Sequence, residues 1–199
     1  MYVRDAKNRD EVWLLDHIEA MALDAAAFRS RDYVIAVDET SDTRTGFGRI
    51  RTHKAEASDA CELTSIGVLD GWRRQGVGAH VVERLLQHAA DQGFETVYAL
   101  APLPEYLGQF GFDPVEPDRL PPPLVDRLEE KRDDRDDRDD RDDGEIIPMA
   151  IPVDRFVMPD RLRERFKTAA ERAGSDPEEQ PEDFGIDPEE ATYKYDTGR

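Results

Sequence analysis

The stretch that decides the fold is ELTSIGVLDGWRRQGVGAHVVERLLQ, residues 62–87. Its first eight residues are mostly apolar and β-prone, which predicts a buried strand over residues 62–69. Residues 70–76 are a loop that holds two arginines and two glycines. Residues 77–87 place valine and leucine at the spacing of one helix face, with charged and polar side chains on the other. The stretch therefore predicts a strand, a basic glycine loop and an amphipathic helix.

This order of elements is suited to binding a phosphate group. The first N–H groups of a helix have no partner inside the helix, and they lie at the positive end of the helix dipole. Glycine at the start of the helix lets a phosphate approach the backbone closely. We therefore expect the backbone N–H groups of residues 75–79 to bind a phosphate, with Arg73 and Arg74 adding positive charge. For either arginine the alternative is a solvated surface charge, and one of the two is expected to be only that.

The loop from Arg73 to Gly78 reads R-x-x-G-x-G. It matches neither the G-x-G-x-x-G of dinucleotide-binding folds nor the G-x-x-x-x-G-K-[ST] of the P-loop. It resembles the pyrophosphate loop, [QR]-x-x-G-x-[GA], of the GNAT N-acetyltransferase family. The strand end IGVLD at residues 66–70, the helix followed by Gly93 and a second strand, and the segment YLGQFGF at residues 106–112 also resemble this family. The resemblance covers residues 61–116.

Within this family, residues 104–112, PEYLGQFGF, are most similar to amino-acid N-acetyltransferases of the N-acetylglutamate synthase type. The resemblance implies an α/β GNAT fold, with a mixed, mostly antiparallel central sheet that is splayed at the acyl-CoA cleft and flanked by helices. It implies transfer of an acetyl group from acetyl-CoA to a primary amine, either a small molecule or an amino acid. A protein N-terminal amine stays open as the acceptor. The alternative function is a catalytically silent acyl-CoA-binding regulatory domain.

The resemblance also implies which residues contact the cofactor. The backbone around Val68 would form hydrogen bonds with the pantetheine arm, and an N–H group there would polarise the thioester carbonyl. The expected cofactor-binding residues are Ile66, Val68, Arg73, Arg74, Gln75, Gly76, Val77, Gly78 and Ala79.

Glu62 is the candidate general base. It precedes Gly76 by fourteen positions, which is the spacing of the base glutamate in histone-acetyltransferase-like members of the family. Strand alternation predicts its side chain on the same face as Thr64, Ile66 and Val68. The alternative is a glutamate at a strand entrance in a glutamate-rich protein. Direct acyl transfer needs no acyl-enzyme, so a nucleophilic Ser-His-Asp or Cys-His set is not expected.

The general acid is where the chain departs from the family. Many GNAT enzymes place a tyrosine four residues before the glycine of the G-F pair, and here that position is Leu107. Tyr106 lies one residue earlier, about 100° away around a helix. We therefore expect Tyr106 to pack beside the cofactor, and we expect His80 to be an exposed residue without a catalytic role.

The composition is strongly acidic. The chain has 199 residues, of which 46 are acidic and 27 basic, giving a formal net charge of −19. Of the basic residues, 22 are arginine and only 5 are lysine. This composition resembles proteins of salt-accumulating halophiles, whose surface repulsion is screened in concentrated salt. It also argues against a nucleic-acid partner, because phosphates would be repelled.

Other composition features bound the location and the cofactors. There is no N-terminal apolar run and no stretch of 18 apolar residues, so we expect a cytoplasmic protein without a signal peptide or a membrane partner. The single cysteine, Cys61, excludes an internal disulfide and is expected to be a buried, inert thiol. No Cys/His cluster suggests zinc, so no metal cofactor is expected. The oligomeric state, monomer or homodimer, stays open.

The chain order predicts one domain and a tail. We expect a GNAT domain over residues 1–157, with a charged insertion at residues 117–145, and a C-terminal helix and acidic tail over residues 158–199. Three consecutive antiparallel strands lead into the glycine loop, and a second short helix is possible over residues 24–28. Residues 132–143 repeat Arg-Asp-Asp four times. Because they include no apolar side chain, we expect a solvated helix or a disordered loop there.

Overall fold

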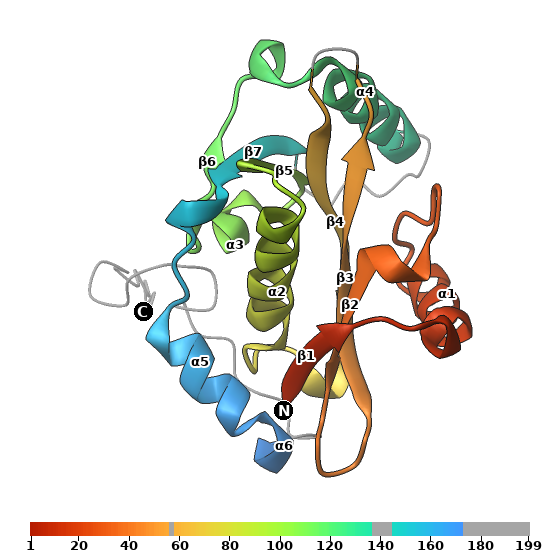
Figure 1. Cartoon of the computed structure of the whole chain (residues 1–199), viewed down its shortest axis with the longest axis vertical. Coiled ribbons are helices and arrows are strands. Elements are labelled where there is room, and N and C mark those ends of the chain that lie inside the picture. Colours follow the sequence, from red (N-terminus) through yellow and green to blue (C-terminus); the bar gives the residue numbers. More distant parts are fainter. Residues whose placement is uncertain (56–57, 137–144, 173–199) are drawn as a thin grey trace, which may run out of the picture.

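The computed structural model describes residues 1–55, 58–136 and 145–172 (Figure 1). These residues form strands and helices, joined in places by short 3-10 turns. They are β1 (Tyr2–Asp5), α1 (Glu11–Ala20), β2 (Tyr33–Val37), β3 (Arg44–His53), β4 (Ala60–Val68), α2 (Val77–Asp91), β5 (Thr96–Ala101), α3 (Pro104–Gly108), β6 (Asp113–Pro114), α4 (Pro122–Asp136), β7 (Ile147–Pro152), α5 (Asp160–Lys167) and α6 (Ala169–Arg172). Within these residues no helix is both long and apolar enough to cross a membrane.

One seven-stranded sheet runs through the molecule in the order β1-β2-β3-β4-β5-β7-β6. The β4–β5 pair is parallel and the other five pairs are antiparallel, which confirms the expected mixed, mostly antiparallel sheet. β4 and β5 pair only from Cys61↔Val97 to Leu63↔Ala99. Beyond that point β4 continues to Val68 and β5 to Ala101 without pairing to each other. The two central strands therefore separate at their carboxyl ends.

The two faces of the sheet carry different helices. α2 buries its apolar side in the main core, together with alternate residues of β2 such as Val34 and Ala36. α1 packs on the opposite face through Leu14 and Ile18, which contact the other β2 residues. A third cluster lies under α4, where three leucines pack against Ala60, Leu100 and Ile146; the leucines are Leu120, Leu124 and Leu128. Figure 1 shows α4 over one end of β4 and α2 alongside β3 and β4.

A β-bulge interrupts the alternation of β4. On β3 the register advances two residues, from Phe47 to Arg49, while β4 advances three, from Gly67 back to Thr64. Ser65 takes up the extra residue with a left-handed φ of 51°. As a result Cys61, Leu63, Ile66 and Val68 all pack in the α2 core. The prediction that Glu62 shares a face with Ile66 and Val68 was therefore wrong, because the bulge reverses the alternation between them.

Two predicted helices differ in the structure. Residues 24–28 form turns rather than a helix, since the Asp24 carboxylate accepts the N–H of Ala26 (2.8 Å) and Ala27 has a φ of 50°. The predicted helix over residues 159–173 is divided at Thr168 into α5 and α6. The insertion forms α4, which begins at Pro122 and continues to Asp136. The rest of the Arg-Asp-Asp repeat up to residue 144, and the predicted tail from residue 173 on, lie outside the described residues.

Candidate active site

The glycine loop joins β4 to α2 at the separated ends of the central strands. Arg74 and Gly76 both have left-handed backbones, with φ of 57° and 77°, and Gly76 is the N-cap of α2. The N–H of His80 is bonded to the Gly76 carbonyl (3.1 Å). The N–H groups of the three preceding residues, Val77 to Ala79, have no partner within the helix. The loop therefore places the N-terminus of α2 at the end of β4, in the strand–loop–helix order that the sequence predicts.

The predicted loop residues lie together but have different contacts. Arg73 is 57% exposed; its Nε donates to the Val68 carbonyl (3.2 Å), and it is 3.0 Å from the Asp70 carboxylate. Gln75 is buried and donates to the Gly71 carbonyl (3.2 Å), so it braces the loop internally. The Arg74 carbonyl accepts a hydrogen bond from Arg165 of α5. Arg73 is thus the more exposed cation at the end of β4.

Both glycines that precede or begin α2 are packed against the rest of the chain. A Cβ atom on Gly76 would lie 2.2 Å from the Leu162 carbonyl oxygen of α5. A Cβ atom on Gly78 would lie 2.6 Å from the Tyr106 hydroxyl of α3. Glycine is therefore needed at both positions by the packing of α3 and α5, independently of any phosphate.

His80 and Tyr106 border this loop. His80 is half-buried rather than exposed, so that prediction was wrong: its Nδ1 is 2.9 Å from the Gly76 carbonyl and its ring stacks on Phe166 at 3.8 Å. Burial lowers the pKa of His80, and it raises the pKa of Tyr106. Leu107, at the position of the family's usual acid, is buried in the core. Tyr106, not Leu107, is therefore the α3 side chain that reaches the loop.

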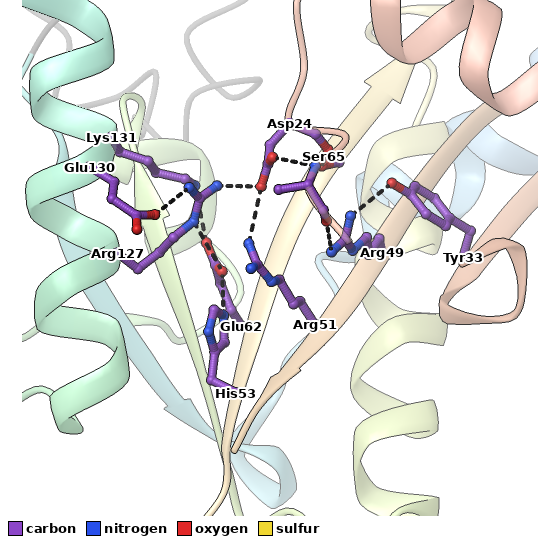
Figure 2. Close-up of polar contacts among 11 residues, drawn as sticks. Asp24, Tyr33, Arg49, Arg51, His53, Glu62, Ser65, Arg127, Glu130 and Lys131 are labelled. Atoms are coloured by element: carbon purple, nitrogen blue, oxygen red, sulfur yellow. Dashed lines mark hydrogen bonds and ion pairs between the residues drawn. The ribbon is translucent and has the colours of Figure 1, made fainter. Parts of the chain in front are cut away.

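The second group of polar residues lies on the opposite face, under α4 (Figure 2). At its centre the Glu62 carboxylate is fully buried, with 0% exposure. It lies 2.8 Å from His53 Nε2, 3.1 Å from Lys131 Nζ and 3.8 Å from Arg127 Nε. Burial alone would raise the pKa of Glu62, but the His53 hydrogen bond and the charges of Lys131 and Arg127 lower it to about 2.

This environment changes what Glu62 can do. A carboxylate with so low a pKa is ionised at neutral pH, but it is a weak base. α4 also separates it from solvent, so an amine could not touch it in this arrangement. The role of Glu62 as a general base stays a prediction, and the geometry favours transfer through an intervening group over direct contact.

Arginines surround Asp24 next to this carboxylate. Asp24 Oδ2 pairs with Arg127 Nη2 and lies 3.5 Å from Arg51 Nη1, while the Asp24 carbonyl accepts from the Ser65 hydroxyl (2.8 Å). Arg49 is fully buried and donates to the Tyr33 hydroxyl (3.2 Å) and to the Ala26 carbonyl (2.7 Å). We call Asp24, Arg49, Arg51, His53, Glu62, Arg127 and Lys131 the acceptor-side cluster (Figure 2).

Comparison with known proteins identifies the family. A model of the acetyltransferase (GNAT) family matches residues 2–112. The chain belongs to the GNAT family. Its fold is similar to N-acetylglutamate synthase from Neisseria gonorrhoeae, solved with coenzyme A and N-acetyl-glutamate, with a TM-score of 0.56 and 16% identity. That match covers 76% of this chain but 34% of the Neisseria chain, so this chain spans about a third of that enzyme.

Two smaller GNAT-like structures match along nearly their whole length. Rv2747 from Mycobacterium tuberculosis, solved in complex with CoA, has a TM-score of 0.57 and 18% identity, and the match covers 76% of this chain and 99% of that one. A GNAT acetyltransferase from Staphylococcus aureus has a TM-score of 0.50 and 10% identity, over 76% and 98% of the two chains. At these identities the likeness shows the fold.

Sequence reasoning missed most of the acceptor-side cluster of this GNAT domain. The signal that could have found part of it is the basic alternation Arg49, Arg51, His53 along a strand, which places three basic side chains on one face. Arg127 and Lys131 carried no such signal, since they are four apart in a charged helix and look like a solvated face. Cys61, in contrast, is a buried thiol as predicted, and burial raises its pKa to about 12.

Proposed function

We propose that this GNAT domain is an acyl-CoA-dependent N-acetyltransferase that moves an acetyl group from acetyl-CoA to a primary amine. The observation that carries the proposal is that β4 separates from β5 and continues directly into the glycine loop. β4 leaves β5 after three residue pairs and leads directly into the basic glycine loop at the N-terminus of α2. An extended thioester arm fits between separated strands, and its pyrophosphate fits the helix N-terminus.

The cofactor contacts follow from these positions. In the proposal the pyrophosphate accepts hydrogen bonds from the backbone of Gln75, Gly76, Val77, Gly78 and Ala79, and Arg73 and Arg74 contribute charge. The backbone of Ile66 and Val68, at the unpaired end of β4, binds the pantetheine arm and polarises the thioester carbonyl. Acetyl-CoA is then a co-substrate that the protein binds mainly through its backbone.

The chemical step needs one proton acceptor. The amine nitrogen attacks the thioester carbon, the carbon–sulfur bond breaks, and the CoA thiolate leaves with the bonding electrons. The amine proton must then be accepted. Because Glu62 is fully buried, we propose that it acts through water, while His53 at 2.8 Å offers the proton a path toward solvent.

We propose a small-molecule amine or an amino acid as the acceptor, by likeness to the N-acetylglutamate synthase type. A screen of CoA release with L-amino acids, polyamines and short peptides, in molar KCl, tests this. Release with an amino acid supports the proposal. A protein that binds acetyl-CoA but releases no CoA with any amine would instead be the silent acyl-CoA-binding domain.

The cofactor part can be tested separately by calorimetry with acetyl-CoA. The double variant Arg73→Gln, Arg74→Gln is expected to lose roughly 10- to 100-fold in affinity, because charge-assisted contacts to phosphate are removed. The double variant Arg29→Gln, Arg31→Gln is the matched control. Both arginines are exposed, and they lie just before the first residue of β2, outside the glycine loop. Equal affinities in the two double variants would reject the glycine loop as the phosphate site.

We also propose that the protein is adapted to high salt, on the basis of its net charge of −19. At about 1 M salt the Debye length is only about 3 Å, so repulsion between surface carboxylates is largely suppressed. The thermal midpoint is expected to rise steeply between dilute buffer and molar KCl. A midpoint that does not change with salt would reject the halophilic assignment.

A further inference from the structure

Arg49 is a buried charge that has no counter-ion among the residues the structure describes. Its side chain is 0% exposed, and its two described hydrogen bonds go to neutral groups, the Tyr33 hydroxyl and the Ala26 carbonyl. Within the described residues its Nε has no hydrogen-bond partner. A buried ion is costly unless a charge of opposite sign lies near it. Arg49 therefore lacks the partner that a fully buried guanidinium normally requires.

The neighbouring arginines do not have enough carboxylates to share. Arg51 reaches Asp24 only at 3.5 Å, and Asp24 is already paired with Arg127. Glu62 is the partner of Lys131 and His53, and Arg127 Nε stays 3.8 Å from it. In the acceptor-side cluster, four side chains that are cationic at neutral pH thus face two carboxylates (Figure 2). Glu130 pairs with Arg127, but it is 66% exposed at the rim. The centre of the cluster keeps an excess of positive charge in a chain that is otherwise strongly acidic.

The excess charge lies where the central strands separate. Arg49 is paired with Thr64 across β3 and β4, directly before the bulge at Ser65. The last β4–β5 pair, Leu63↔Ala99, is at the same level of the sheet. In the proposed reaction the thioester lies at this separation. Arg51 follows Arg49 by two residues on the same strand, so a group bound near these two charges would lie beside the reacting centre, on the face opposite α2.

We propose that Arg51 of β3, which is 23% exposed, binds a carboxylate of the acceptor, and that the buried charges of Arg49 and Arg127 strengthen this binding, so that the substrate is an amine that also carries a carboxylate. A planar carboxylate can accept paired hydrogen bonds from guanidinium groups and supplies the missing negative charge. Polyamines and amines without an acid group are disfavoured by the same charge. This inference rests on the proposed function only for the statement that the bound carboxylate belongs to the acceptor.

The test measures binding without turnover. Calorimetry in the presence of CoA compares N-acetyl-L-amino acids with their α-carboxamides at one fixed salt concentration. The wild-type protein is expected to bind at least one carboxylate roughly 10- to 100-fold more tightly than its carboxamide, and Arg51→Gln is expected to remove that preference. Arg49→Lys should weaken it too, but because Arg49 is fully buried, Arg51→Gln is the variant on which the test depends.

Arg84→Gln is the matched control. Arg84 lies on α2, is 30% exposed against 23% for Arg51, and also pairs with one aspartate, Asp5. The inference is overturned if the wild-type protein binds no carboxylate better than its carboxamide, or if Arg51→Gln and Arg84→Gln bind alike. An Arg51-dependent carboxylate preference without CoA release from any amine would keep the carboxylate site and reject the acetyltransferase proposal.

Discussion

The two ends of β4 are built in opposite ways. At its carboxyl end the glycine loop is contiguous in sequence, from Ile66 to Ala79, and its geometry depends on backbone conformation at Arg74 and Gly76. Around Glu62, nearer its start, the acceptor-side cluster gathers residues from between positions 24 and 131, and it depends on charge pairs between distant elements. The contacts of the first region come mainly from the backbone, whereas the second region is complete only when α4 supplies Arg127 and Lys131.

This difference separates what is shared from what is particular. The glycine loop is the part by which the chain resembles its family, because a phosphate-binding backbone needs few side chains. The cluster depends on α4, which lies between β6 and β7, and it combines side chains whose charges must match. We therefore expect cofactor binding to depend on few side chains, chiefly Arg73 and Arg74, and the acceptor side to depend on many.

The largest effect is expected from Glu62→Gln. This change removes the central charge of the cluster and leaves Lys131 and Arg127 without it in a buried site. Loss of one partner of a buried ion pair typically costs 3–5 kcal/mol, so the free energy of unfolding should fall by about 3 kcal/mol. If Glu62 also accepts the proton, turnover should fall by about 10²- to 10⁴-fold, with acetyl-CoA affinity little changed. Urea unfolding and CoA release measure the two effects.

Glu130→Gln is the control for this test. Glu130 lies on α4 and pairs with Arg127 of the same helix at 3.2 Å, but it is exposed. Its removal should change the free energy of unfolding by less than about 0.5 kcal/mol. Similar stability losses for the two variants would contradict the distinction between the buried cluster and its rim.

Acid should weaken the cluster before it weakens the glycine loop. The pKa of Glu62 is about 2 in the folded protein, against an ordinary value of 4.5. Its stabilising contribution is fully present above pH 4.5 and is lost as pH falls toward 2, and it amounts to about 3 kcal/mol. Urea unfolding between pH 6 and 3 should show a smaller acid loss in Glu62→Gln than in the wild type.

Asp10 supplies an internal reference for the acid measurement. Its hydrogen bond from Arg4 lowers its pKa despite burial, so a part of the acid loss should remain in Glu62→Gln. Parallel acid slopes in the two proteins would show that Glu62 titrates in the same way folded and unfolded.

A smaller effect is expected from Gly76→Ala, compared with Gly93→Ala. Both glycines have positive φ, 77° and 85°, so alanine pays a backbone cost of about 1 kcal/mol at either position. Only at Gly76 would the new Cβ meet an atom, the Leu162 carbonyl at 2.2 Å, whereas nothing lies within 4 Å at Gly93. We expect Gly76→Ala to lose roughly 2 kcal/mol more.

Hydrogen exchange of the α5 amides locates that difference. Exchange should accelerate in Gly76→Ala and stay unchanged in Gly93→Ala, because only the first variant displaces α5. Equal stability losses and equal exchange in the two variants would show that the packing of α5 accommodates the new methyl group without cost. Where α5 does move, a loss of acetyl-CoA affinity in a Gly76 variant cannot be assigned to the phosphate contact alone.

The smallest effect is expected from Tyr106→Phe. The Tyr106 hydroxyl packs near Gly78. Burial raises the pKa of Tyr106, so its hydroxyl is a weaker acid than an exposed tyrosine. A CoA thiolate can also leave with a proton from water. Turnover should fall less than roughly tenfold, with the alkaline limb of the pH–rate profile unmoved. A loss near a thousandfold would identify Tyr106 as the general acid.

The sequence predicts the glycine loop well and the acceptor-side cluster poorly. The strand, loop and helix of residues 62–87 were correct because apolar periodicity and glycine positions are local signals, and Gly93 ends α2 in the expected left-handed conformation. The prediction that Ile66 and Val68 share a face with Glu62 was wrong. The bulge that separates them lies at Ser65, and nothing in the sequence indicates that this serine has a positive φ. The possible helix over residues 24–28 is absent because the Asp24 side chain accepts the N–H of Ala26 and stabilises a turn instead.

The acceptor-side cluster could not have been assembled from the sequence. Its members are joined by long-range pairing of β3 with β4 and by the docking of α4, and neither leaves a periodic pattern. Glu62 was found only through the family spacing, which locates the residue but says nothing of its neighbours. The cations that lower its pKa come from β3 and from an insertion that composition alone describes as solvated.

The order of the elements along the chain also sets the order in which the molecule can be completed. β2, β3 and β4 pair with their sequence neighbours, so they can associate as they leave the ribosome. Arg127 is made 65 positions after Glu62, which at 5–20 residues per second is roughly 3 to 13 seconds of translation. A nascent chain halted before α4 therefore carries Glu62 beside His53 but without Arg127 and Lys131. The acceptor-side cluster is therefore completed late in synthesis, after the glycine loop has already been made.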